Sequence, residues 1–323
     1  MPVTVVVSSE QAGLTVAALL RQLLPGHSWS QVRRIVETRR VRVGGDLCRD
    51  PARRLKAGDS FELLDRPLPR PTQADDIIVR HLDEHVIVVE KPSGVNTVRH
   101  PSERDWPERR KELVPTLEDL VPRLIRLREG KWEKGPPPRL RVVHRLDKET
   151  SGLVVFARTV AAERGLGKQF HAHTVERRYL AIVPGVFTAR TIRSRLVRDR
   201  GDGRRGSTEA PVGGKEAITH VEVVETLPGY TLLQCRLETG RTHQIRIHLA
   251  EAGHPVCGEK VYCRTRSGEI LSDSSGAPRL ALHATALGFQ HPVTGEALSW
   301  TMPLPEDLQQ FVERLRGVSG NQP

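Results

Sequence analysis

One polar loop of the sequence combines residue types that covalent or acid–base chemistry requires. Asp147 lies within HRLDKETSG (residues 144–152), and the apolar run LVVFA (residues 153–157) follows directly. An ionised carboxylate in such a loop can attack an electrophilic carbon or accept a proton. It can equally be purely structural. The pattern by itself leaves these two interpretations evenly balanced.

Other side chains with chemical potential have ordinary structural interpretations as well. Tyr179 lies in the apolar sequence RRYLAIV, where a tyrosine is usually a core aromatic. Arg246 lies in a sequence with helical periodicity, where an arginine is usually a surface residue. His144 and His243 are expected to be hydrogen-bonding scaffold rather than acid–base catalysts.

Neither a cofactor nor a metal is predicted. The sequence contains no glycine-rich phosphate loop of the nucleotide-binding types. Its cysteines are scattered and form no CxxC pair, so neither a disulfide framework nor a zinc site is expected. Reduced thiols are expected instead, at Cys48, Cys235, Cys257 and Cys263.

The composition favours a partner with many negative charges. The 323 residues include 50 Lys and Arg against 39 Asp and Glu, a formal net charge of +11. Cationic side chains that contact phosphates release condensed counterions, which favours binding to nucleic acid. The charge alone does not distinguish RNA from DNA or from an anionic membrane. Because no apolar run approaches the roughly 20 residues of a membrane span and no signal peptide is apparent, a cytoplasmic protein is expected.

The first 65 residues form a predicted small module. Apolar residues at helical spacing predict a helix over residues 14–24. Ser28 and Gln31 form a capping-box pattern, which predicts the start of a second helix. VRVGGDLC (residues 41–48) predicts a tight hairpin whose glycines adopt positive φ angles.

Basic residues concentrate in this module. Between Arg33 and Lys56 nine basic residues stand against three acidic ones, a local charge of +6. A solvated surface is the alternative, but the position beside a helix and a hairpin favours a face that contacts phosphates. The residues expected to make these contacts include Arg33, Arg34, Arg39 and Arg40.

The remaining chain divides into a linker, a large domain and a tail. Three prolines in residues 66–76 predict an extended linker. Residues 77–316 mix strand and helix patterns without an internal repeat, which predicts an α+β domain, and the charged segment 101–139 is interpreted as a surface insertion. Residues 317–323 are expected to be a disordered tail. Strands are expected at 77–79, 86–90, 153–157, 179–183, 219–224 and 231–237, and helices at 116–127, 160–173, 242–252 and 306–316.

The N-terminal module resembles the small S-four-like RNA-binding domain, which is named after a ribosomal protein. The resemblance covers about residues 10–64 and rests on the two helices, the VxVxG hairpin and the LKAGD turn. Trp29 stands where that domain usually has an arginine, and Gly44-Gly45 replaces its usual Asn-Gly. The resemblance implies that the module binds RNA.

The loop around Asp147 resembles the signature HRLDKETSGL of the RluA-type pseudouridine synthases. The resemblance spans nearly all of residues 77–310, with its motifs in the family's order. These motifs are EKPSGV (90–95), RRYLAIV (177–183), GKEAITH (214–220), TGRTHQIRIHL (239–249), LHATALGFQHPVTGE (282–296) and PLPEDL (303–308). Glu259 departs from the aspartate that the family typically has, and at most a structural effect is expected from this change.

The resemblance implies an α+β catalytic domain with a mixed, mainly antiparallel sheet that isomerises uridine to pseudouridine within RNA. Asp147 is then the catalytic residue, and Arg246 is the guanidinium partner that favours its ionised state. Tyr179 is the active-site tyrosine. Because the reaction conserves the atoms of the uridine, no cofactor or metal is expected. Whether Asp147 attacks C1′ of the ribose or acts through a glycal intermediate stays open.

The same resemblance implies RNA contacts close to the active site. Arg145, His144 and Arg241 are expected to hold the RNA after the target nucleotide leaves the base stack. Ribosomal RNA is favoured over transfer RNA as the partner. The protein is expected to act as a monomer and without a membrane.

Three other functions compete with this interpretation. The first is an RNA-binding protein of the same fold that has lost activity. The second is another base-acting enzyme, but a zinc deaminase needs an HxE…PCxxC arrangement that the sequence lacks, and a glycosidase would release free uracil. The third is a metal-dependent nuclease, which needs clustered carboxylates that are not evident in the motifs.

Overall fold

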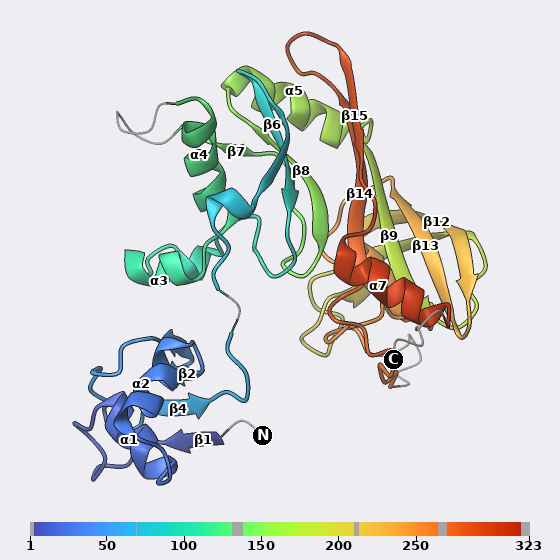
Figure 1. The fold of residues 1–323 in the computed structure, drawn as a ribbon. Helices are drawn as coiled ribbons and strands as arrows, with labels where there is room; N and C mark the ends of the chain where they lie inside the picture. The colour runs from blue at the N-terminus through green and yellow to red at the C-terminus, as the bar shows by residue number, and fades with distance from the viewer. Residues whose placement is uncertain (1–2, 69, 131–137, 210–212, 264–269, 318–323) are drawn as a thin grey trace. The chain divides into compact units, whose positions relative to one another are not determined.

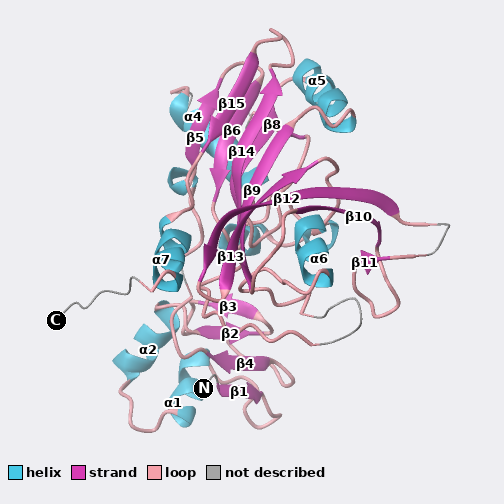
Figure 2. Ribbon diagram, turned by 90° about the vertical axis from the view of Figure 1, so that its right-hand side faces the viewer, coloured by secondary structure: helices cyan, strands magenta, loops and turns pink. Residues whose placement is uncertain are grey.

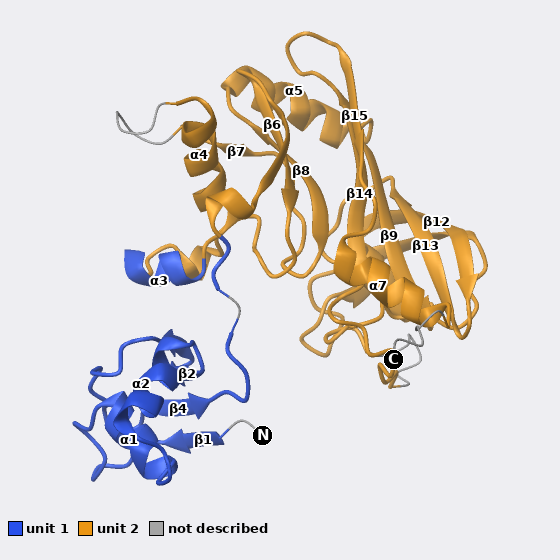
Figure 3. Ribbon diagram, viewed as in Figure 1, with its two compact units in different colours: residues 1–72, 107–114 blue, residues 73–106, 115–323 orange. Residues whose placement is uncertain are grey.

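The computed structural model describes residues 3–68, 70–130, 138–209, 213–263 and 270–317 (Figure 1). The chain forms two compact units, one of Met1–Thr72 with Pro107–Val114 and one of Gln73–Trp106 with Pro115–Pro323 (Figure 3). All but the first residue of the predicted tail 317–323 lie outside the described residues. No helix in the described part of the chain is long and apolar enough to span a membrane.

The first unit contains a four-stranded antiparallel sheet in the order β1-β4-β2-β3, with two helices packed on it. The Ser28–Gln31 capping box predicted for the second helix is present. Gly44 and Gly45 turn the predicted hairpin with φ angles of 63° and 80°. The elements are β1 (Val3–Val6), α1 (Val16–Leu23), α2 (Trp29–Glu37), β2 (Val41–Val43), β3 (Asp46–Cys48), β4 (Ser60–Leu63) and α3 (Glu108–Leu113).

The second unit is built on a mixed sheet of eleven described strands. Its main path is β11-β10-β12-β13-β9-β14-β8-β6-β5, and β15 and β7 pair with β14 and β8 (Figure 2). The described strand pairs are antiparallel except β14 with β8, so the sheet is mixed and mainly antiparallel, as predicted. The strands are β5 (Ile78–Leu82), β6 (Val86–Lys91), β7 (Arg141–Val142), β8 (Ser151–Ala157), β9 (Glu176–Pro184), β10 (Arg190–Val197), β11 (Gly206–Ser207), β12 (Lys215–Leu227), β13 (Tyr230–Leu237), β14 (Leu282–Gln290) and β15 (Ala297–Thr301).

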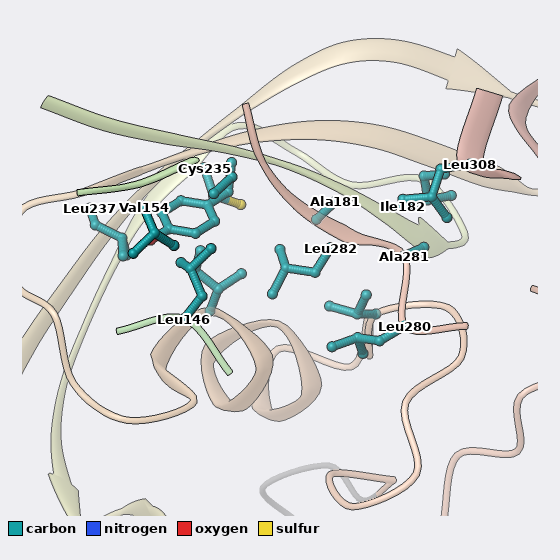
Figure 4. Packing of buried hydrophobic residues seen from close by; sticks show 14 of the residues in the cluster. Leu146, Val154, Ala181, Ile182, Cys235, Leu237, Leu280, Ala281, Leu282 and Leu308 are labelled. Atoms are coloured by element: carbon teal, nitrogen blue, oxygen red, sulfur yellow. The ribbon is translucent and has the colours of Figure 1, made fainter. Parts of the chain in front are cut away.

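The alternation of side chains along the strands produces two cores, one on each face of the sheet. Val154 and Phe156 of β8 belong to one core, and Leu153 and Val155 belong to the other, because successive side chains of a strand point to opposite faces. The first core also contains residues of three helices, and Figure 4 shows Leu308 from the last of them in that cluster. The helices of this unit are α4 (Leu117–Arg128), α5 (Val160–His171), α6 (Gln244–Glu251) and α7 (Glu306–Leu315), with short 3-10 turns at Ala74–Asp76 and Pro101–Glu103.

The interpretation of residues 101–139 as a surface insertion is wrong for helix α4. This helix buries six side chains, including Leu117 and Ile125, which are fully buried in the first core. Its charged residues lie on the other face. Because they make up much of the segment, its composition alone suggested a surface location. Pro122 lies inside the helix and has no amide hydrogen to donate to the carbonyl one turn before it. Packing of the apolar stripe in the core offsets the loss of this hydrogen bond.

Gly152 stands at the junction between the parallel and antiparallel parts of the sheet. Its φ angle is 123°, and a Cβ atom at this position would lie 2.2 Å from the backbone oxygen of Ala284 on β14. A side chain therefore has no room unless β8 and β14 separate. Because Gly152 ends the loop that carries Asp147, this glycine also fixes the position of the loop.

We predict that Gly152→Ala lowers the free energy of unfolding by about 2–4 kcal/mol, because it combines an unfavourable φ angle with a backbone clash. The measurement is urea denaturation of both proteins. Gly167→Ala is the matched control: Gly167 is an exposed glycine of α5 with open space around it, and alanine there should stabilise the helix by up to about 1 kcal/mol. Equal stabilities of Gly152→Ala and the wild type would contradict the prediction.

Candidate active site

One cavity of about 410 Å³ in the second unit is lined by segments that are distant in the sequence. The chemically active side chains come from the loop before β8, from β9, and from the turn before α6 with the start of that helix. The end of α5, the end of β13 and the start of β14 complete the lining. Pairing of β9 with β13 and β14 sets Tyr179 opposite Cys235 and Ala284. The six site residues predicted for this unit all line the cavity: Asp147, Tyr179, Arg246, Arg145, His144 and Arg241.

The loop that carries Asp147 is held by hydrogen bonds from the end of β6 and from the segment that follows it. The Nζ atom of buried Lys91 donates to three backbone carbonyls, including that of Lys148 at 2.8 Å. The Thr97 hydroxyl donates to the carbonyl of Leu146 at 2.9 Å. The backbone is therefore held on both sides of Asp147. Burial lowers the pKa of Lys91 to about 7.

Arg246 contacts two carboxylates in different ways. Its Nε and Nη2 atoms donate to the two oxygens of Glu259 at 2.7 and 2.6 Å, a bidentate pair in which both residues are buried. Its Nη1 atom lies 3.5 Å from Oδ2 of Asp147. Burial opposes the ionised form of Glu259, but the hydrogen bonds and charge of Arg246 outweigh burial and lower its pKa. Glu259 therefore orients the guanidinium that faces Asp147, a role that the sequence motifs alone did not assign to it.

His243 lies on the other side of the Asp147 carboxylate. Its Nε2 atom is 3.7 Å from Oδ1 of Asp147, and its Nδ1 atom is 2.7 Å from the hydroxyl of Tyr262. Burial lowers the pKa of His243 and raises that of Tyr262 to about 12. Both groups are therefore neutral at physiological pH. The tautomer with its proton on Nε2 presents that proton to the Asp147 carboxylate, and in this tautomer Nδ1 accepts from the Tyr262 hydroxyl.

The backbone of His243 is also unusual. Its φ and ψ angles are 60° and 19°, in the left-handed region that a non-glycine residue seldom adopts. Among the described residues, only two other non-glycine residues, Arg39 and His173, have a positive φ. Strain of this kind is typical of functional sites. His243 was expected to be hydrogen-bonding scaffold, and its hydrogen bond to Tyr262 agrees with that expectation. The role of Tyr262 was not found in the sequence, because a spacing of 19 residues does not show that the two side chains meet.

Tyr179 lies almost fully buried in the wall of the cavity, with 7% of its surface exposed. Burial is the main cause that raises its pKa, and the nearby charge of Asp147 acts in the same direction. The phenol is therefore neutral at physiological pH. Its position in the cavity allows the ring to contact a base and the hydroxyl to exchange a proton.

The three predicted RNA-binding residues of this unit differ in their surroundings. His144 accepts a hydrogen bond from the amide of Val155 at 3.0 Å, and burial lowers its pKa to about 3, so it is a neutral scaffold residue. Arg145 is exposed at the cavity and is available to a ligand. Arg241 donates from Nε to the carbonyl of Glu216 and keeps its other nitrogens for further contacts.

The basic residues of the first unit also divide into two groups. Arg33 and Arg34 are exposed on α2. Arg39 has a φ angle of 69° and is half-buried, and Arg40 donates from Nε to the carbonyl of Leu64 at 3.0 Å. The first two are therefore free to contact a polyanion, whereas Arg40 is bonded to the segment that follows β4.

All four cysteines are free thiols, and three of them are buried. Among the residues that the structure describes, no group of three or more His, Cys, Asp or Glu side chains is arranged to hold a metal ion.

Comparisons with known proteins agree with the domain predicted for each unit. The sequence profile described as RNA pseudouridylate synthase matches residues 85–251, and the S4 domain profile matches residues 16–61. The chain is 35% identical to the ribosomal large subunit pseudouridine synthase D of Nitrosomonas europaea, over 95% of this chain and 86% of the relative. It is 37% identical to the protein of the same name from Zymomonas mobilis, over 84% of each.

Among solved structures, the human RNA pseudouridylate synthase domain containing 4 shares the fold, with a TM-score of 0.58 and 24% identity over 74% of this chain and 92% of that chain. The similarity to known proteins thus includes the fold as well as the sequence. The chain belongs to the RNA pseudouridylate synthase family and carries an S4 domain at its N-terminal end.

Proposed function

We propose that this RNA pseudouridine synthase modifies uridines of large-subunit ribosomal RNA, with Asp147 as its catalytic residue. The observation that carries the proposal is the position of Asp147 in the cavity, between the guanidinium of Arg246 and the imidazole of His243 and in the same cavity as Tyr179. The names of the relatives, which refer to the large ribosomal subunit, support this choice of RNA.

The reaction requires one ionised carboxylate and a site for the detached base. The bond from ribose C1′ to N1 of the uracil breaks, the base turns, and a bond from C1′ to C5 forms. The proton on C5 is then lost, while N1 gains one, so atoms and charge balance. Asp147 begins this sequence either by attacking C1′ or by removing a ribose proton, and Tyr179 is placed to contact the turning base.

The distances around Asp147 suit both routes. The 3.5 Å to Arg246 and 3.7 Å to His243 are longer than hydrogen bonds, so the carboxylate oxygens are held by charge and orientation without being fully occupied. We assign Glu259 and Tyr262 as positioning residues, because they act on Asp147 only through Arg246 and His243. Arg145, His144 and Arg241 complete the RNA-facing side of the cavity.

In this proposal one unit binds RNA and the other carries out catalysis. Residues 1–65 form the RNA-binding domain, residues 66–76 the linker, and residues 77–316 the catalytic domain. Arg33 and Arg34, with Arg39 and Arg40 behind them, contact RNA phosphates. The enzyme needs no metal or cofactor in this proposal, because the isomerisation requires no external atom or electron. The proposal also places it in the cytoplasm, as a monomer and away from any membrane.

Asp147→Asn should abolish pseudouridine formation, by about a thousandfold or more, while RNA binding changes little. The substitution keeps the shape of the side chain and removes its charge. The measurement is tritium release from large-subunit ribosomal RNA labelled at uracil C5, followed by mapping of the modified positions. Turnover near the wild-type rate would remove Asp147 from its role. Absence of tritium release with the wild type would reject this RNA as the substrate.

Glu259→Gln should lower the free energy of unfolding by about 3–5 kcal/mol, because it leaves the buried guanidinium of Arg246 without its counter-charge. It should also lower kcat, because Nη1 of Arg246 is then free to turn away from Asp147. Urea denaturation and single-turnover kinetics measure the two effects. Glu222→Gln, at an exposed residue of β12, is the control and should change both by little. A fully stable and active Glu259→Gln protein would show that the pair does not orient Arg246.

Replacing both Arg33 and Arg34 by alanine should weaken RNA binding and flatten its salt dependence. Removing one phosphate contact lowers the slope of log K against log salt by about 0.7–0.9. The rate at saturating RNA should not change, because neither residue lies in the active-site cavity. Filter binding at several salt concentrations measures the slope. An unchanged slope would show that α2 does not contact the RNA backbone.

A further inference from the structure

A second cavity of about 490 Å³ adjoins the active-site cavity. It lies between the end of β10, the start of β12 and the turn of residues 240–242. That turn lines both cavities. A polymer with one unit in the active-site cavity can therefore reach the second cavity with a neighbouring unit.

The lining of the second cavity is strongly cationic. Four of its nine lining residues carry positive charge, and none is acidic; the four are Arg198, Arg205, Lys215 and Arg241. Among the described residues, no carboxylate forms an ion pair with any of them. Their mutual repulsion is unfavourable in the free protein and is relieved by an anion in the cavity.

Other basic residues of this region do have acidic partners, as the neighbouring Arg200 shows. It forms ion pairs with Asp202 and Glu251, at 3.0 and 3.8 Å. Arg200 is thus neutralised by nearby carboxylates, whereas the cavity keeps its cations without a counter-charge from the described part of the chain. Arg205 also acts electrostatically on His243 in the active-site cavity, so the positive potential extends across the shared turn.

We propose that this cavity binds the phosphodiester group of a nucleotide next to the target uridine. The proposal rests on the proposed function and adds the path of the RNA strand: from the active site over residues 240–242 and into the cationic cavity. Guanidinium groups bind phosphate oxygens through paired hydrogen bonds, which explains why arginine predominates in the lining. Binding there holds the flanking backbone while the uridine leaves the stack, and so offsets part of the cost of extrusion.

The test compares two arginines of the same strand region. Arg198→Ala removes a lining residue, and Arg193→Ala removes an exposed arginine of β10 that lines none of the cavities described. With a transcript of large-subunit ribosomal RNA, Arg198→Ala should weaken binding about tenfold at low salt and lower the salt slope by about 0.7–0.9. Arg193→Ala should change affinity by less than about twofold.

Lys215→Ala provides a second variant of the cavity and should reproduce the effect of Arg198→Ala. Equal losses of affinity in Arg193→Ala and Arg198→Ala would overturn the proposal, because the surface would then act only through its overall charge. Unchanged affinity in both cavity variants would also overturn it. The binding measurement does not require turnover, so failure of the cavity is distinguishable from failure of the proposed function, which tritium release by the wild type tests.

Discussion

The geometry of the candidate active site depends on the buried guanidinium of Arg246, which faces the carboxylates of both Glu259 and Asp147. Arg246 needs a counter-charge to be stable in the interior, and Glu259 supplies it through two short hydrogen bonds. This pairing leaves Nη1 of the guanidinium directed at Asp147 without a full ion pair between them. If Asp147 were the main partner of Arg246, its oxygens would be occupied and poorly able to react. Glu259 thus leaves the carboxylate of Asp147 accessible from the cavity.

The surrounding fold holds three segments in fixed positions around the cavity. Lys91 and Thr97 fix the backbone on both sides of Asp147, β9 carries Tyr179, and the strained residue His243 begins the helix that carries Arg246. Leu146 belongs to the first core and is labelled with Val154 and Leu237 in the cluster of Figure 4, so the residue before the carboxylate is anchored in apolar packing. Packing and polar contacts therefore restrict the same short loop.

Much of this could be predicted from the sequence. The apolar residues of β6 and β8 predicted strands, the Ser28–Gln31 pair predicted the start of a helix, and the motif around Asp147 predicted the family. Helix α4 was predicted at residues 116–127, but its burial was missed because its charged face lies in a segment rich in charge. The contacts of Glu259, His243 and Tyr262 could not be predicted, because they depend on the backbone conformation of His243 and on how the chain returns after α6.

The parallel pairing of β8 with β14 has a consequence for synthesis of the protein on the ribosome. Ser151 and His283, which are paired across these strands, are 132 residues apart, so this pairing cannot form until β14 has been translated. At about 5–20 residues per second, β8 waits on the order of ten seconds for its partner. Contacts this distant in sequence form slowly, and a nascent chain that stops before β14 lacks the strand that pairs with Ser151 and Gly152. The sheet around the candidate site is therefore complete only after β14 has been translated.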